Sequence, residues 1–311
     1  MQNQENYISV EECAEKLGIS ARSVRNYCAA GRIAGAKLTG KTWEIPSNVE
    51  KPKRKPRFDQ MPQSVAGILK MEMEAKMKGG LYHRLQIDFT YNSNHMEGSR
   101  LTHDQTRWIF ETRTIGKLDA DIPVDDLVET VNHFRCIDKV IATSGAALTE
   151  AYIKDLHRIL KTGTSDAAKA WFAVGDYKKL ENIVGEMETC PVKKVHAEIS
   201  KLLKSYQASS KSFENIVDFH VRFEQIHPFQ DGNGRVGRLI MLKECLKQGY
   251  TPFVIAENLK QFYYLGLQDW RYGRRARLLD TCRTGQDVFA LGLRQFGHRR
   301  LAEKAEKELA V

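Results

Sequence analysis

The sequence lacks paired cysteines, a recognisable export signal and any long apolar run. No CxxC pair occurs, which argues against a zinc knuckle or a redox motif of that type. The opening stretch MQNQENYISVEE has no basic region followed by an apolar segment, so it predicts no secretory signal. No apolar run approaches the roughly twenty residues that a membrane span needs. Six dispersed, unpaired cysteines and no export signal predict a soluble protein of the reducing cytoplasm.

Length and charge narrow the choice further. The 311 residues exceed the usual size of one domain and predict two structural units, and no internal repeat is evident. The formal net charge of +9 suits an anionic partner such as nucleic acid or a nucleotide. Many other proteins are equally basic, so the charge alone does not select a function.

Residues 1–47 predict two short helices followed by a β-hairpin. Ser9 and Glu12 form the pattern of a capping box at the start of the first helix, and Gly18 is placed to end it. A second helix begins at Ser20. The stretch RIAGAKLTGKTWEIP then predicts two short strands around Thr39-Gly40.

This order of elements resembles the winged helix-turn-helix of the excisionase or MerR-like kind. The resemblance implies DNA binding, since small polar and basic side chains on a second helix suit base edges and phosphates in a major groove. A protein-docking module with a solvated basic face is the alternative interpretation. The candidate DNA contacts are Arg22, Ser23, Arg25 and Asn26.

A competing phosphate-binding motif lies in the predicted hairpin. GAKLTGKT, from Gly35 to Thr42, fits the P-loop spacing GxxxxGK[ST]. In a working P-loop the Lys-Ser/Thr pair begins a helix whose amides hold the phosphates. Here Lys41-Thr42 leads into the extended stretch WEIP, which proline closes. We therefore interpret the match as chance spacing.

A basic, proline-containing linker is predicted over residues 48–63, either as a solvated tether or as a source of nonspecific phosphate contacts. Beyond it, apolar residues at three- and four-residue spacing predict a mainly helical domain over residues 64–257 and a helical extension over residues 258–311. The stretch LENIVGEMETCP, from Leu180 to Pro191, instead predicts a short hairpin. The basic side chains of the linker are Lys51, Lys53, Arg54, Lys55 and Arg57.

The stretch IHPFQDGNGRVGR, from Ile226 to Arg238, is the strongest candidate for a functional site. Pro228 is predicted to end one helix just after His227, and the pattern becomes helical again from Arg235. The glycine-rich segment between them therefore forms a tight loop at a helix N-terminus. Free amides and the helix dipole favour an anion at that position.

The side chains of this stretch suit phosphate chemistry. His227 is the group that can take a proton near neutral pH, and Asp231 offers a hard oxygen to Mg²⁺. Asn233 supplies a neutral donor, and Arg235 and Arg238 can both lean over the same helix end. A base, a metal ligand and a phosphate cradle together predict transfer of a phosphorus-containing group.

Two structural alternatives explain parts of this cluster. A metal shared by His220, His227 and Asp231 is disfavoured, because Pro228 breaks the helical face that would present both histidines. A structural histidine beside solvated arginines explains single residues but not the whole combination. Catalysis by His227 is the preferred interpretation.

The segment HPFQDGNGRVGR resembles the Fic-domain motif HPFx(D/N)GNGRxxR and matches it at every specified position. The resemblance extends over residues from about 90 to 255. It implies a mostly α fold, a Fic-type helical bundle with a short β-hairpin flap, preceded here by the small winged helix-turn-helix domain. It also implies an adenylyltransferase that moves AMP from ATP to a Tyr, Thr or Ser hydroxyl of a protein, with Mg²⁺ as cofactor.

The resemblance implies a role for each motif residue. His227 would deprotonate the target hydroxyl, Asp231 would hold Mg²⁺ against the α- and β-phosphates, and Arg238 would take the γ-phosphate. The hairpin from Leu180 to Pro191 would be the flap that pairs with an extended target segment. The residues expected to bind the remaining phosphate oxygens are Gly232, Asn233, Gly234 and Arg235.

An inhibitory pattern lies upstream in YNSNHMEGSRLT. Ser93 and Glu97 fit the Fic inhibitory motif (S/T)xxxE(G/N), here within the segment 93–98. A bidentate pair between Glu97 and Arg238 would occupy the guanidinium that the γ-phosphate needs, so the enzyme is predicted to be autoinhibited in cis. A surface glutamate before a glycine that ends a helix is the alternative. In some relatives the equivalent glutamate supports removal of AMP, and the sequence leaves that reaction open.

A second function remains open at this stage. The chain could be a DNA-binding transcriptional regulator whose Fic domain serves as a nucleotide-dependent or self-modifying switch. The donor could also be another nucleotide, with base contacts near Tyr263 and Tyr264. Self-modification and homo-oligomer formation are compatible with the sequence, and no membrane partner is expected.

Overall fold

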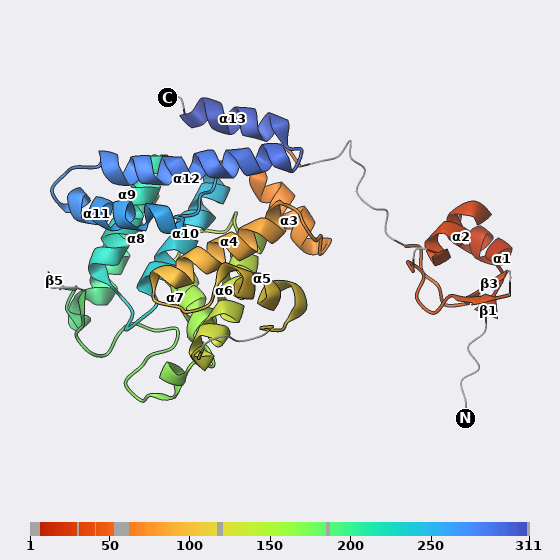
Figure 1. The fold of residues 1–311 in the computed structure, drawn as a ribbon, viewed down its shortest axis with the longest axis horizontal. Coiled ribbons are helices and arrows are strands. Elements are labelled where there is room, and N and C mark those ends of the chain that lie inside the picture. The colour runs from red at the N-terminus through yellow and green to blue at the C-terminus, as the bar shows by residue number, and fades with distance from the viewer. Residues whose placement is uncertain are drawn as a thin grey trace. The chain divides into compact units, whose positions relative to one another are not determined.

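The computed structural model describes residues 7–29, 31–40, 42–52, 62–116, 121–184 and 187–309. It divides into two compact units, Met1–Met61 and Pro62–Val311 (Figure 1). Lys41 of the P-loop-like stretch, most of the basic linker and the tip of the predicted flap lie outside the described residues. Within those described ranges, no helix combines the length and the apolar character needed to cross a membrane.

The first unit packs two helices against a three-stranded antiparallel sheet of order β1-β3-β2. The capping box of Ser9 and Glu12 is present, and Gly18 ends the first helix in the left-handed region at φ 61°. The predicted hairpin is also confirmed, whereas the short first strand was not predicted. The elements are β1 (Tyr7–Ile8), α1 (Val10–Leu17), α2 (Ala21–Ala29), β2 (Lys37–Thr39) and β3 (Thr42–Pro46).

The described residues of the P-loop-like stretch include β2 and the first residue of β3. Thr42 begins β3 and pairs with Thr39 of β2 in the antiparallel register. A P-loop threonine would instead begin a helix. The prediction of chance spacing is confirmed for the described part of this stretch.

The second unit is helical, as predicted, and the one sheet among its described residues is a two-stranded hairpin in the position of the predicted flap. Its helices before the flap are α3 (Val65–Glu74), α4 (Leu81–Met96), α5 (His103–Thr112), α6 (Val124–Ala142) and α7 (Glu150–Lys161). The flap strands are β4 (Ile183–Val184) and β5 (Met187–Glu188). The helices after the flap are α8 (Val195–Ala208), α9 (Phe213–Ile226), α10 (Asn233–Gln248), α11 (Lys260–Arg271), α12 (Ala276–Gln295) and α13 (Arg299–Leu309).

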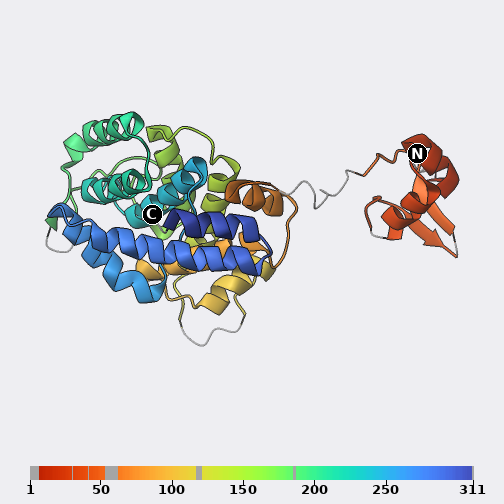
Figure 2. The same ribbon diagram turned by 90° about the horizontal axis from the view of Figure 1, so that it is seen from above.

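Helix α10 lies at the centre of this unit. All of its residues from Asn233 to Leu246 are buried, and it packs against α3, α4, α6, α7 and α9. A helix buried on every face carries no amphipathic stripe, which distinguishes it from the one-sided helices around it. Helices α11, α12 and α13 pack on one another on one side of the bundle (Figures 1 and 2). Helices α4, α6 and α7, which pack against α10, carry further side chains of the candidate site.

Candidate active site

A six-residue turn between α9 and α10 carries the candidate catalytic histidine. Helix α9 ends at Ile226, and His227 adopts the left-handed conformation at φ 50° while its N–H donates to Phe223 O at 2.9 Å. Gly232, at φ 81°, precedes α10 and permits the reversal in chain direction. Helix α10 begins at Asn233, two residues earlier than predicted. The loop therefore does end at a helix N-terminus.

Asn233 closes this turn. Its Oδ1 accepts from Phe229 N at 2.8 Å, and its Nδ2 donates to Phe229 O at 2.9 Å. Both ends of the amide thus bind the backbone of one residue, Phe229, and Asn233 is 2% exposed. This contact explains why an amide is needed at the position, whereas phosphate binding by Asn233 stays a prediction.

His227 is held in the uncharged state. Burial, reinforced by the positive charge of Lys178, lowers the pKa of its imidazole to about 4. The backbone of Glu224 and the carboxylates of Glu97 and Asp231 oppose this shift without cancelling it. A neutral imidazole at physiological pH can accept a proton, as a general base must.

His157 supports the turn from α7 and was missed in the sequence. Its ring stacks on Phe229 with centroids 3.9 Å apart. Gly175 N donates to its Nδ1 at 3.0 Å, which places the proton on Nε2, and Nε2 donates to Asp231 O at 3.1 Å. Burial lowers the pKa of His157 to about 3, so this arrangement persists across the physiological range. In the sequence it is one histidine on an amphipathic helix, with no signal that distinguishes it from a core residue.

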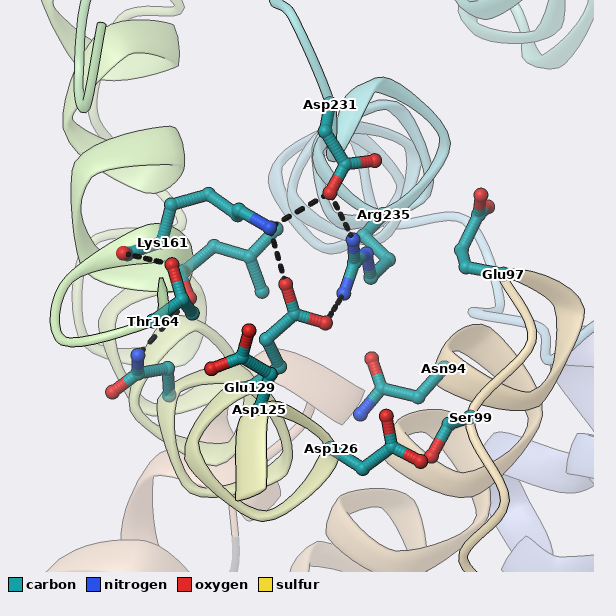
Figure 3. A network of polar contacts seen from close by, with 12 residues as sticks. Asn94, Glu97, Ser99, Asp125, Asp126, Glu129, Lys161, Thr164, Asp231 and Arg235 are labelled. Atoms are coloured by element: carbon teal, nitrogen blue, oxygen red, sulfur yellow. Dashed lines mark hydrogen bonds and ion pairs between the residues drawn. The ribbon is translucent and has the colours of Figure 1, made fainter. Parts of the chain in front are cut away.

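Asp231 belongs to a closed ring of alternating charges (Figure 3). Its Oδ2 lies 2.7 Å from Lys161 Nζ and 3.1 Å from Arg235 Nη2. Glu129 completes the ring: its Oε1 lies 2.5 Å from Lys161 Nζ and its Oε2 pairs with Arg235 Nη1. Burial opposes ionisation of Asp231, but the charges of Arg235 and Lys161 hold the pKa of this carboxyl well below its usual range. Asp231 is therefore a carboxylate at neutral pH.

The donor set at Asp231 fits a magnesium ion shared with phosphates. Within the described part of the chain, no three His, Cys, Asp or Glu side chains converge to form a metal cage. Mg²⁺ is typically held by one or two carboxylates together with substrate phosphates rather than by an all-protein cage. Asp231 can supply that one carboxylate oxygen.

The structure places Arg235 differently from the prediction that it binds phosphate. Its side chain is 4% exposed, and its ion pairs join it to Glu129 and Asp231. Glu129 lies on α6, more than a hundred residues away in the sequence, so no local pattern could have indicated this pair. Phosphate binding by Arg235 stays a prediction.

Arg238 contacts Ser93 and Glu97 of the segment 93–98, but in a different geometry from the one predicted. Its Nη2 lies 2.6 Å from Glu97 Oε1 and donates to Ser93 O at 2.9 Å, while Nε donates to Ser93 Oγ at 3.0 Å. The carboxylate therefore makes one contact rather than the predicted bidentate pair, and Ser93 accepts from Nε and also from Nη2. A Cβ at Gly234 would collide with Glu97 Oε1 and lie 2.9 Å from Arg238 Nη1, so the pair also needs this glycine.

Hydrogen bonds join the base of the flap to the turn between α9 and α10. Lys178, 2% exposed, donates from Nζ to Asn182 Oδ1 at 2.6 Å and to Thr189 Oγ1 at 2.5 Å, and from its backbone to Pro228 O at 2.9 Å. Asn182 Nδ2 donates to Phe229 O at 3.2 Å. Residues before β4 and after β5 are thus held beside the turn that carries His227.

The remaining candidate residues differ in how accessible they are. Tyr263 is 1% exposed and hydrogen-bonds His220 Nε2 at 2.6 Å, so it offers no face to a nucleotide base. Tyr264 is 39% exposed and donates to Met96 O at 3.2 Å. The expected base contact is therefore restricted to Tyr264.

Of the four candidate DNA contacts in the first unit, Arg22 and Asn26 are exposed, and neither forms an ion pair or hydrogen bond with another described residue through its side chain. Arg25 is exposed but lies 2.9 Å from Glu11, and Ser23 Oγ lies 2.9 Å from Ser20 Oγ. The exposed face of α2 is therefore less basic than the sequence suggested.

Comparison with known proteins agrees with the geometry of the turn. Residues 147–245 match the Fic/DOC family. Proteins named "Protein adenylyltransferase Fic" are similar to the chain: that of Aedes aegypti is 25% identical over 224 residues, covering 70% of this chain and 42% of the relative. That of Drosophila persimilis is 30% identical over 185 residues, covering 56% of this chain and 34% of the relative. The chain spans less than half the length of these curated relatives.

Solved structures support the same fold. A Fic domain-containing signaling protein from Bacteroides thetaiotaomicron superposes with a TM-score of 0.58 at 22% identity, covering 72% of this chain and 89% of its own. Fic-1 from C. elegans superposes with a TM-score of 0.59 at 16% identity, covering 76% of this chain and 71% of its own. At these identities the likeness shows the Fic fold alone. The predicted Fic-type helical bundle is confirmed.

Proposed function

We propose that the chain transfers AMP from ATP to a Ser, Thr or Tyr hydroxyl of a protein, and that Glu97 inhibits the transfer in cis. The observation that carries this proposal is the turn at the start of α10, which brings a neutral imidazole, an ionised Asp231 and Arg238 to one helix end. The match of residues 147–245 to the Fic/DOC family and the names of the relatives support it.

Each group has a defined task in this reaction. His227 accepts the proton of the target hydroxyl, whose oxygen forms a bond to the α-phosphorus as the bond to pyrophosphate breaks. Mg²⁺ held by Asp231 would neutralise charge on the phosphates. The amides at the start of α10 bind phosphate oxygens, and the positioning they provide is the main contribution a protein makes to such a transfer.

Glu97 inhibits by occupying Arg238. The guanidinium is 4% exposed, and the contacts described above commit its Nε and Nη2 to Ser93 and Glu97. A γ-phosphate that needs this cation must displace the carboxylate. Without Arg238 the triphosphate is misplaced for in-line attack, which a positioning-dominated reaction does not tolerate.

Intact mass spectrometry of the purified chain after incubation with ATP and Mg²⁺ tests the proposal. Glu97→Gly is expected to raise self-modification by AMP at least about a hundredfold over the unaltered chain, because one-sided loss of a buried pair is worth about 3–5 kcal/mol. His227→Ala in the same background is expected to remove it. Unchanged modification in Glu97→Gly would exclude the inhibitory role, and modification that survives His227→Ala would exclude the base.

We further propose DNA binding by the first unit as a second function. Its two helices and three-stranded sheet support this proposal, with Arg22 and Asn26 exposed on α2. Selection of bound sequences from a random DNA pool tests it. Enrichment of a sequence that Arg22→Ala and Asn26→Ala no longer retain is expected, whereas absence of enrichment would leave a protein-docking module as the better interpretation.

A further inference from the structure

Two members of the charged ring belong neither to the catalytic turn nor to the Fic-domain motif. Glu129 comes from α6 and Lys161 is the last residue of α7. Figure 3 shows both side chains converging on the pair formed by Asp231 and Arg235. The ring contains two carboxylates and two cations, so its formal charge is zero.

The ring engages a single oxygen of Asp231. Oδ2 receives both Lys161 Nζ, at 2.7 Å, and Arg235 Nη2, at 3.1 Å. Figure 3 shows the other carboxylate oxygen of Asp231 turned away from both cations. A carboxylate fixed in this way has a defined direction in which it can offer its second oxygen to a metal ion.

Lys161 is the most deeply buried cation of the cluster. Its side chain is 2% exposed, and its ammonium lies between three carboxylates: Glu129 at 2.5 Å, Asp231 at 2.7 Å and Asp166 at 3.2 Å. The positive charge of Lys161 is thus shared among these three carboxylates. Glu129 draws part of the charge of both Lys161 and Arg235 away from Asp231.

We propose that Glu129 and Lys161 are positioning residues for Asp231, and that the balance between them sets how strongly Asp231 attracts a divalent cation on the nucleotide. The inference rests on the proposed function, in which Asp231 is the metal ligand. Without the negative charge of Glu129, Lys161 and Arg235 neutralise Asp231 more fully, and its attraction for a metal ion becomes weaker. Loss of the Lys161 charge has the opposite effect.

Nucleotide affinity with and without metal measures this balance. The probe is α,β-methylene ATP, which cannot release pyrophosphate, titrated into the full chain carrying Glu97→Gly in the presence of Mn²⁺ or of EDTA. The ratio of the dissociation constant in EDTA to that in Mn²⁺ reports the contribution of the metal. The Glu97→Gly chain is the parent with which the variants are compared. Glu129→Gln is expected to lower that ratio about tenfold and Lys161→Met to raise it about tenfold, since each changes the charge beside Asp231 by one unit. The double variant is expected to return the ratio to that of the parent.

Opposite shifts distinguish positioning from a purely structural role, which would weaken binding in both variants and leave the ratio unchanged. Shifts in the same direction, or ratios within about twofold of the parent, would overturn the proposal. Lys201→Met is the matched control. Lys201 on α8 is 72% exposed and lies 4.0 Å from Oε2 of Glu198, so the variant loses the same charge away from the ring and is expected to keep the parental ratio.

If circular dichroism shows that either ring variant does not fold, a milder variant tests the proposal. Asp166 is outside the ring, and Asp166→Asn leaves Lys161 freer to neutralise Asp231. It is expected to lower the ratio about threefold, and no change or a rise would overturn the proposal.

Binding to the parent, the chain carrying Glu97→Gly, distinguishes failure of the proposed function from failure of this inference alone. If Mn²⁺ fails to strengthen binding of the analogue in the parent, the proposed function fails together with this inference. If Mn²⁺ strengthens binding in the parent and the ring variants do not shift the ratio, the inference alone fails.

Discussion

Arg235 and Arg238 lie three residues apart on α10, and both side chains are 4% exposed, yet their partners differ in kind. Arg235 lies between Glu129 and Asp231 in a closed ring. Arg238 meets one carboxylate, Glu97, which is 28% exposed and follows the last residue of α4. One motif thus supplies one arginine held between two carboxylates and another that, under the proposed function, exchanges a carboxylate for a phosphate. The surrounding helices, rather than the motif, decide which is which.

Removal of each arginine in turn tests whether their roles differ in this way. Arg235→Met is expected to lower the free energy of unfolding by about 3–5 kcal/mol, because it leaves two carboxylates to share Lys161, and the Glu129 side chain is only 15% exposed. Arg238→Met is expected to cost about 1–3 kcal/mol, because the carboxylate of Glu97 retains access to water. Urea denaturation followed by circular dichroism measures both. Equal losses, or a larger loss for Arg238→Met, would contradict the distinction.

Ser93→Ala should reproduce part of the effect of removing Glu97. The variant deletes the Oγ that accepts from Arg238 Nε at 3.0 Å but keeps the backbone contact to Ser93 O. Self-modification is expected to rise about three- to tenfold, as suits one hydrogen bond to a charged group. Radiolabel incorporation measures it.

Ser99→Ala is the matched control for this variant. Ser99 lies two residues after Glu97 and its Oγ accepts from Leu101 N at 3.4 Å, away from Arg238. No rise is expected there. An equal rise in both variants would show that loosening the end of α4, rather than freeing Arg238, activates the protein.

The smallest expected effect is the position of the acid limb in the pH profile. The pKa of His227 lies below its usual range, at about 4, so the base stays neutral and active above that pH and loses activity as pH falls through it. The Glu97→Gly chain is therefore expected to keep its rate from pH 7 down to about pH 5. Initial rates, with circular dichroism to confirm folding at each pH, measure this. A midpoint near 6.5 would show an unperturbed histidine.

The sequence predicted the local features well. The capping box at Ser9, the hairpin before Pro46 and the turn after His227 each depend on residues within a few positions of one another. Their geometry follows from hydrogen bonds and backbone preferences that a short stretch contains. The start of α10 was the exception, since Asn233 and Gly234 are already helical.

The long-range features could not be predicted with the same certainty. Glu129 and Lys161 join the ring around Asp231 from positions 102 and 70 residues upstream of it, and a lone glutamate or lysine on an amphipathic helix is usually solvated. His157 likewise lacks any distinguishing neighbour. The pairing of Glu97 with Arg238 was foreseen because both residues belong to a family pattern, but the share that Ser93 takes depends on how α4 packs against α10.

Labelling of the Glu97→Gly chain with ATP that is radioactive in either the α- or the γ-phosphate distinguishes AMP transfer from phosphate transfer and tests the role of His227. Transfer of AMP by His227 predicts stable incorporation from α-labelled ATP, none from γ-labelled ATP, and loss of the label in the additional His227→Ala variant. Incorporation from γ-labelled ATP, or α-label that persists without His227, would contradict the account.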